Sequence, residues 1–426
     1  MAPTAAGRTD VGRVRTNNED SLLIDDTLGL YIVADGMGGH SAGEVASRTA
    51  CEVVQREIGG LTKPRARFEQ SGKSGDLKAL CRAVSAAMTT ACKAIFKMAQ
   101  KNPELAGMGC TCTLMWVLPH NKGILGHIGD SRLYVLRNRR IHQLSEDHSF
   151  VNELLKRGAI TKAQAKNHPQ GNVLSRAMGP QPSVPMDTMA FDIDAGDVYL
   201  LCSDGLTHYY PEPEEMAAEL LAADQQAGVD ALIDRALERG GHDNTTAISL
   251  RFAGAPLQDA AAAENRIALL KRIPIFAHLS YNELVRVVGL TSLKQIPAST
   301  LFIQEGQPGD ELYVVLAGEV EVLKGDDRLA ELGAGVHLGE MAMVDSAPRS
   351  ASVRALSDVT LLVMGRTEFF GLIRAEPVIA SKLLWSFVQV LSTRLRDTNE
   401  ALRGARDPGE DAFEVFLDDD DDDDDN

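Results

Sequence analysis

Short apolar runs separated by turn residues dominate the chain from Gly7 to about Arg251, and they constrain the fold more than any other sequence feature. The runs SLLIDDTLGLYIVAD, CTLMWVL, GILGHIGDSRLYVLR, DVYLLCSD and TAISLRF have the length and composition of strands. Two stretches between them, roughly Ala42 to Ile58 and Leu77 to Gln100, repeat apolar residues at three- and four-residue intervals and predict helices. Strands separated by paired helices predict a layered α/β sandwich.

A different pattern begins after an Ala-rich segment that is poor in core residues, AGAPLQDAAAAEN. A predicted helix to about Gly289 is followed, as far as Val363, by short strands broken by Gly and Pro turns, which is typical of a small β-barrel or jelly roll. A long amphipathic helix is predicted from Glu376 to Leu402. We therefore divide the 426 residues into a first domain (1–252), a linker (253–265), a second domain with its C-terminal helix (266–402) and a disordered acidic tail (403–426).

The eight consecutive carboxylates of Asp418 to Asp425 supply nearly half of the formal net charge of -17. No basic stripe appears in the sequence, which argues against nucleic acid as the main partner. The six cysteines form no CxxC pairs and have no His partners at zinc-finger spacing, which favours reduced thiols. Neither a signal-peptide core nor a run approaching the roughly 18 apolar residues of a membrane span is evident. We therefore expect a cytoplasmic protein that does not enter a membrane.

Acidic residues recur in the first domain where predicted strands begin or end. Asp35 ends YIVAD, Asp204 ends VYLLCSD and Asp243 precedes TTAISL. Asp130 lies within ILGHIGDSRLY, so four strands could deliver carboxylates to one end of a sheet. Convergent oxygen ligands without His or Cys select Mg²⁺ or Mn²⁺. Each Asp alone has a simpler explanation, because Asp-Gly is a common turn dipeptide.

Six motifs occur in a fixed order: VRTNNED (14–20), VADGMGG (33–39), GDSRLY (129–134), LSRAMG (174–179), LCSDGL (201–206) and HDNTT (242–246). This set resembles the bacterial branch of the metal-dependent protein phosphatases of type 2C, over about Gly7 to Arg251. The resemblance implies an αββα sandwich whose cleft holds two Mn²⁺ or Mg²⁺ ions, with a third and weaker ion in bacterial relatives. Asp35 would bridge the first two ions, and Asp204 and Asp243 would complete one site. The remaining implied ligands are the Gly36 carbonyl, Glu19, Asp20, Asp130 for the third ion, and Asn244 in a supporting role.

The implied activity is hydrolysis of phosphoserine and phosphothreonine in proteins, with a cognate Ser/Thr kinase as a further expected partner. A water shared by two divalent ions loses its proton readily, so no covalent phosphoenzyme is required. Arg15 matches the family's phosphate-binding arginine, and a guanidinium can hold two phosphate oxygens at once. The catalytic set is thus Arg15, Asp35, Asp204 and Asp243. An inactive phosphatase-like scaffold is the alternative.

Met37 stands where some relatives carry a His that can protonate the leaving group. A metal-bound water is then the first candidate for the general acid, and His148 or His168 the second. The polar stretch from Ser145 to Gly179 resembles the family's flap beside the active site, and we expect it to influence substrate choice.

The run GEMAMVDSAPRSAS, from Gly339 to Ser352, resembles the phosphate-binding cassette of cyclic-nucleotide-binding domains. In that resemblance Arg349 neutralises the cyclic phosphate, Glu340 accepts from the ribose 2′-hydroxyl, and Ser350 favours cyclic GMP over cyclic AMP without deciding between them. The implied binding residues are Gly339, Glu340, Met341, Ala342, Arg349 and Ser350. A barrel that has lost its ligand is the alternative. A transcription factor of the catabolite-activator type would need a helix-turn-helix after the barrel, and the chain has one helix and an acidic tail there.

Overall fold

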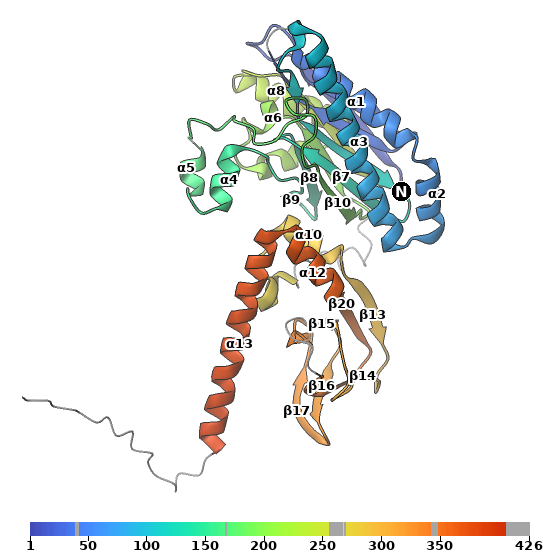
Figure 1. The fold of residues 1–426 in the computed structure, drawn as a ribbon, viewed down its shortest axis with the longest axis vertical. Coiled ribbons are helices and arrows are strands. Elements are labelled where there is room, and N and C mark those ends of the chain that lie inside the picture. The colour runs from blue at the N-terminus through green and yellow to red at the C-terminus, as the bar shows by residue number, and fades with distance from the viewer. Residues whose placement is uncertain (39–41, 167, 255–266, 268–269, 342–347, 406–426) are drawn as a thin grey trace, which may run out of the picture.

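The computed structural model describes residues 1–38, 42–166, 168–254, 267, 270–341 and 348–405. Its first domain contains two five-stranded antiparallel sheets that pack face to face (Figure 1). One sheet has the order β1-β12-β11-β8-β9, with bounds Pro3–Asp10, Thr245–Phe252, Val198–Cys202, Arg132–Arg137 and Arg140–Gln143. The other has the order β10-β7-β6-β3-β2, with bounds Asp187–Asp192, Lys122–Ile128, Cys112–Leu118, Leu30–Ala34 and Ser21–Asp25.

Helices cover the outer face of each sheet and complete the layers. The β10-to-β2 sheet packs against α1 (Ala42–Gly59) and α3 (Ser74–Lys101), with α2 (Thr62–Ser71) alongside α3. The other sheet packs against α8 (Gln225–Glu238), α7 (Ala217–Leu220) and α6 (Asp204–Thr207). The predicted αββα sandwich is therefore confirmed, and α2 is a helix that the sequence analysis missed. The shorter elements are β4 (Gly36–Met37), η1 (Pro103–Leu105), β5 (Gly109–Cys110), α4 (Phe150–Lys156), α5 (Lys162–Lys166) and η2 (Pro213–Met216).

Helix α3 is long and apolar enough to cross a membrane by length and composition alone, so the expectation that no segment approaches a span was wrong for this helix. In the fold, its Leu80, Val84 and Met88 side chains are fully buried in the core beneath the sheet. Helix α3 therefore occupies the position of a core helix in this domain.

The second domain is rich in short antiparallel strands, as expected for a jelly roll. One sheet has the order β13-β20-β15-β18, with bounds Ser292–Ile296, Val359–Gly365, Glu311–Ala317 and His337–Leu338. The other has the order β14-β19-β16-β17, with bounds Leu301–Ile303, Ser352–Ala355, Val320–Lys324 and Asp327–Leu332. Helical elements flank the strands: η3 (Pro274–Phe276), α10 (Tyr281–Val288), α12 (Arg366–Ala375) and α13 (Pro377–Ala405). Most of the expected linker and nearly all of the acidic tail lie outside the described residues.

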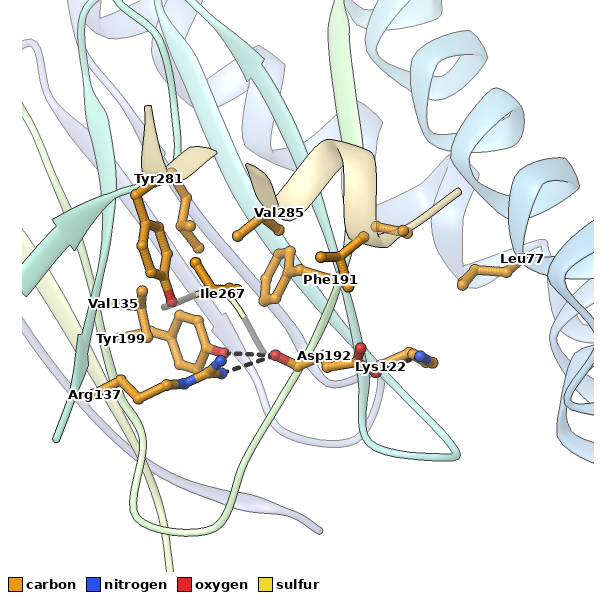
Figure 2. A pocket seen from close by; sticks show the side chains of 14 residues that line it. Leu77, Lys122, Val135, Arg137, Phe191, Asp192, Tyr199, Ile267, Tyr281 and Val285 are labelled. Atoms are coloured by element: carbon orange, nitrogen blue, oxygen red, sulfur yellow. Dashed lines mark hydrogen bonds and ion pairs between the residues drawn. The ribbon is translucent and has the colours of Figure 1, made fainter. Parts of the chain in front are cut away.

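The two domains share one apolar cluster. It runs from the space between the two sheets of the sandwich to residues of η3, α10, α12 and α13. Figure 2 shows Tyr281 and Val285 of α10 beside Phe191 and Tyr199 of the sandwich, around a cavity of about 70 Å³. The Tyr281 ring also stacks on the His142 ring, with centroids 3.8 Å apart. Helix α10 is thus the main contact of the second domain with strands β9 and β10.

A buried ion pair lies at the edge of this shared cluster. Arg137 Nε donates to Asp197 Oδ1 at 2.8 Å, and the Asp197 side chain is only 2% exposed. The second oxygen of Asp197 accepts from the Tyr199 hydroxyl at 3.0 Å and from the Asp194 amide at 2.8 Å. Both oxygens of the Asp197 carboxylate therefore accept hydrogen bonds from the protein.

We predict that Asp197→Ala lowers the free energy of unfolding by about 3 kcal/mol, because the buried Arg137 would lose one of its two carboxylate partners and keep only Asp194, at 3.1 Å. Urea denaturation followed by circular dichroism measures this difference. The matched control is Asp234→Ala, which removes a carboxylate that pairs with Arg8 and is 58% exposed, and which we expect to cost less than about 1 kcal/mol. Equal losses in the two variants would contradict the prediction.

Candidate active site

A cleft of about 500 Å³ opens where several strands of the sandwich end. Five acidic residues line it: Glu19, Asp35, Asp130, Asp204 and Asp243. Asp35 and Asp130 follow β3 and β7 of one sheet, whereas Asp204 follows β11 and Asp243 precedes β12 of the other sheet. The expectation that four strands deliver carboxylates to one place agrees with this arrangement. The strands come from both sheets, however, and not from a single sheet.

Hydrogen bonds to Thr111 fix the backbone of Asp35 at the cleft. Its amide donates to Thr111 Oγ1 at 2.9 Å, and its carbonyl accepts from the Thr111 amide at 2.8 Å. The next residue, Gly36, has no room for a side chain, because a Cβ there would lie 2.2 Å from the Gly43 carbonyl oxygen and 2.5 Å from that of Glu19. Glycine at this position therefore lets the start of α1 and the Glu19 loop approach Asp35.

Asp20 and Asn244 were expected among the metal ligands, but neither lines the cleft. Asp20 is 7% exposed, and its Oδ2 accepts from Ser203 Oγ at 2.8 Å and Thr246 Oγ1 at 2.7 Å. The Asn244 side chain accepts from the Glu19 amide at 2.8 Å and donates to the carbonyls of Val11 and Asn17. In this structure both side chains support the walls of the cleft, and Asn244 ties the loop that carries Arg15 and Glu19 to β12.

Crowding of the carboxylates raises their pKa values. Burial, followed by the charges of Asp20 and Asp204, holds the pKa of Asp35 well above its usual range. Burial, with repulsion from Asp204, raises the pKa of Asp130 to about 8. Burial also raises the pKa of Asp20 to about 7, although two hydroxyls donate to it. Carboxylates buried this closely are favourable only when protons or cations offset their charge.

The donor set fits Mg²⁺ or Mn²⁺. All the candidate donors are oxygens, which hard divalent cations prefer. Among the described residues, no three His, Cys, Asp or Glu side chains form a group able to hold an ion by themselves. Ions bound in this cleft would therefore take part of their coordination from the Gly36 carbonyl and from water in addition to the carboxylates. A buried oxygen of Asp20, Oδ1, has no hydrogen-bond partner among the described residues and is left unsatisfied behind the cleft.

Two arginines also line the cleft. Arg15 Nη2 donates to Asp243 Oδ2 at 2.8 Å, and both side chains are about half exposed, so this pair is accessible to a substrate. Arg176 lies on the flap side of the cleft, and Arg176 Nη1 donates to Asp187 Oδ1 at 3.2 Å. The sequence analysis did not single out Arg176, although its position inside the motif LSRAMG was a usable signal.

The residues proposed for acid catalysis are placed differently from one another. Met37 lines the cleft, whereas His148 and His168 do not. His148 is 2% exposed, and its ring nitrogens face the Gly129 amide at 3.2 Å and Asp187 Oδ2 at 3.2 Å. His168 Nδ1 accepts from the Gln170 amide at 3.2 Å within the flap. This geometry favours water over either histidine as the proton donor.

The second domain contains a cavity of about 370 Å³ at the cassette. Its lining includes Gly339, Glu340, Met341, Arg349 and Ser350, and Ala342 lies outside the described residues. Glu340 is 4% exposed, while Arg349 Nη2 donates to the Glu311 carbonyl at 2.9 Å. Gly309 makes room for that guanidinium, since a Cβ at Gly309 would lie 2.0 Å from Arg349 Nε.

Comparison with known families gives two matches. Residues 12–238 match the model described as "Protein phosphatase 2C". The chain belongs to the protein phosphatase 2C family. Residues 293–376 match the "Cyclic nucleotide-binding domain" model, so the second domain is of that type. The prediction that the chain is a metal-dependent protein serine/threonine phosphatase is confirmed at the level of the family.

Individual relatives agree with this assignment. The serine/threonine phosphatase stp of Listeria monocytogenes is 37% identical over 246 residues, which are 57% of this chain and 92% of that protein. The solved structure of the phosphatase PstP/Ppp of Mycobacterium tuberculosis is 35% identical, with a TM-score of 0.52, and covers 60% of this chain and 100% of that one. A solved PstP catalytic domain, 33% identical with a TM-score of 0.50 and covering 59% of this chain and 99% of its own, is in complex with two manganese ions.

The raised pKa values predict the pH dependence of stability in EDTA. The folded chain keeps protons on Asp20 and Asp130 that an unfolded chain loses above about 3.8, so the free energy of unfolding falls as pH rises towards about 7 and 8. We expect Tm in EDTA to decrease between about pH 5 and pH 8, and Mn²⁺ to restore it at the upper end. Differential scanning fluorimetry measures Tm, and Asp130→Asn should weaken the decrease. A Tm in EDTA that rises over this range would refute the explanation.

Proposed function

We propose that the first domain hydrolyses phosphoserine and phosphothreonine esters of proteins at a two-metal centre, and that a cyclic nucleotide bound to the second domain modulates this hydrolysis. The observation that carries the proposal is the cleft itself, in which five carboxylates from both sheets meet two arginines. A negatively charged lining would repel a phosphate ester unless cations were bound, and the arginines alone do not balance it.

The ion-binding roles are those that the family resemblance implies, and the positions of the residues in the cleft support them. Asp35, which interacts with Asp204 and Asp130, would contact both ions, and Asp204 and Asp243 would complete one site. The Gly36 carbonyl and Glu19 would serve the second ion, and Asp130 a third, weaker one. Divalent cations, when bound, supply water activation and neutralise the charge that develops on phosphorus.

Direct hydrolysis needs few further groups from the protein. The oxygen of a water forms the new bond to phosphorus, the bond from phosphorus to the Ser or Thr oxygen breaks, and that oxygen takes up a proton. Arg15 is half exposed and can exchange its bond to Asp243 for two bonds to phosphate oxygens, which would orient the ester for attack. Water in the open cleft is the nearest proton source, because neither flap histidine lines it.

For the second domain, the cavity and its polar lining support a cyclic nucleotide. Arg349 would exchange its bond to the Glu311 carbonyl for the cyclic phosphate, and Glu340 would accept from the ribose 2′-hydroxyl. Ser350 lines the same cavity, where its hydroxyl could contact a guanine. The ligand can modulate hydrolysis only if it binds two conformations of the chain unequally.

The hydrolysis is tested with a phosphothreonine peptide and the full chain, in Mn²⁺ or in EDTA. We expect turnover in Mn²⁺ that EDTA abolishes, and a loss of at least about 100-fold in kcat for Asp204→Asn, because that carboxylate would be a metal ligand. Asp230→Asn removes a half-exposed carboxylate on α8 and should leave turnover unchanged. Wild-type protein that shows no turnover and no Mn²⁺-dependent rise in Tm would instead identify the domain as an inactive scaffold.

Ligand binding is tested by isothermal titration of the full chain with cyclic GMP and cyclic AMP. We expect one of them to bind, and Arg349→Gln to weaken its binding about 10- to 100-fold through loss of a charged hydrogen bond to the phosphate. Arg328→Gln changes an exposed arginine that pairs with Glu331 and should bind like the wild type. If neither nucleotide binds the wild type, the second domain is a structural barrel and the modulation is refuted.

A further inference from the structure

Four side chains of alternating charge run from the cleft to the second domain. Arg176, which lines the cleft, binds Asp187 at 3.2 Å. Asp187 begins β10, and its Oδ2 lies 3.9 Å from Arg286 Nη2 on α10. Arg286 in turn pairs with Glu376, the residue between α12 and α13. The series therefore connects the junction of the two C-terminal helices with the wall of the active site.

Asp187 is the member that both domains share. Its Oδ1 accepts from Arg176, while its Oδ2 faces His148 and Arg286. His148 Nδ1 accepts from the Gly129 amide, and His148 Nε2 lies 3.2 Å from Asp187 Oδ2 and 3.4 Å from Arg176 Nη1. Although burial alone would raise the pKa of Asp187, the contact with His148 and then the charge of Arg286 hold it well below its usual range, so the carboxylate is ionised. The single negative charge of Asp187 is thus shared between the guanidinium groups of Arg176 and Arg286 and cannot neutralise both.

Arg286 likewise has two carboxylate partners. Its side chain is only 14% exposed, and its Nε has no hydrogen-bond partner among the described residues. If α13 moved relative to α12 and withdrew Glu376, Arg286 would depend on Asp187 alone and compete more strongly with Arg176. A cavity of about 440 Å³ borders Arg286 and Glu376 between α3, β10 and α12, and leaves space for such a movement.

We propose that Asp187 and Arg286 are positioning residues for Arg176, and that the junction at Glu376 controls through them how strongly Arg176 is held away from a substrate phosphate. The inference rests on the proposed hydrolysis in the same cleft. When Asp187 is drawn to Arg286, Arg176 is released and binds the phosphate of the substrate. When Arg286 is lost, Asp187 retains Arg176 and the substrate binds more weakly.

The test measures KM and kcat of the full chain in Mn²⁺ for a phosphothreonine peptide, with p-nitrophenyl phosphate as a second substrate that establishes turnover. Arg286→Gln should raise KM for the peptide by about fivefold, and Glu376→Gln should lower it by a similar factor, with kcat unchanged, as expected for loss of a partly exposed ion pair. In the Asp187→Asn background both shifts should disappear. Arg374→Gln is the matched control, since this exposed arginine of α12 donates to the carbonyl of Phe370 on its own helix.

A general loss of stability cannot produce shifts of opposite sign that vanish together. Shifts of the same sign, additive effects with Asp187→Asn, or an equal shift in Arg374→Gln would overturn the positioning role while leaving the hydrolysis intact. Wild-type protein inactive on both substrates would overturn the proposed function and this inference together. Should Arg286→Gln fail to fold, Glu376→Gln with and without Asp187→Asn decides the question.

Discussion

Repulsion among buried carboxylates at one end of the sandwich is the constraint on which the site depends. Asp35, Asp130 and Asp204 approach one another because three separate strands end there, and burial raises all three pKa values. An isolated sheet could not impose this proximity, since the strands belong to both sheets. The packed core between the sheets therefore supplies the free energy that holds like charges together. The same repulsion makes the cleft a favourable place for divalent cations.

The first domain could be predicted in some detail because its motifs coincide with strand ends. Asp35, Asp130, Asp204 and Asp243 all line the cleft, as their positions beside apolar runs indicated. The prediction was less accurate for Asp20 and Asn244, which are adjacent in sequence to lining residues but do not line the cleft. Adjacent residues in the segments before β2 and β12 face different ways: Asp20 and Asn244 turn into the protein, while Glu19 and Asp243 line the cleft. A motif identifies the pair of residues, whereas the direction of each side chain depends on the fold.

Arg176 and Asp187 could not be connected from sequence for a different reason. They are brought together by the packing of the flap against the edge strand β10, and Arg286 approaches only because α10 of the other domain packs there. Such contacts depend on tertiary placement and on a domain interface, neither of which has a local signature in the chain. The helix-patterned segment before Gly289 predicted helical structure but not its partner surface.

The interface between the domains combines two kinds of interaction with different consequences. The apolar cluster around Tyr281 and Val285 is non-directional and attaches the second domain to the sandwich over a range of small displacements. The ion pairs of Arg286 are directional, and its guanidinium has two discrete carboxylate partners, Asp187 and Glu376. A small shift of α13 could therefore leave the apolar attachment intact and still exchange one ion pair for another. The ion pairs depend on direction and the apolar contact does not. The charged series, and not the larger apolar contact, is therefore the part of the interface suited to transmit a shift of α13 to the cleft.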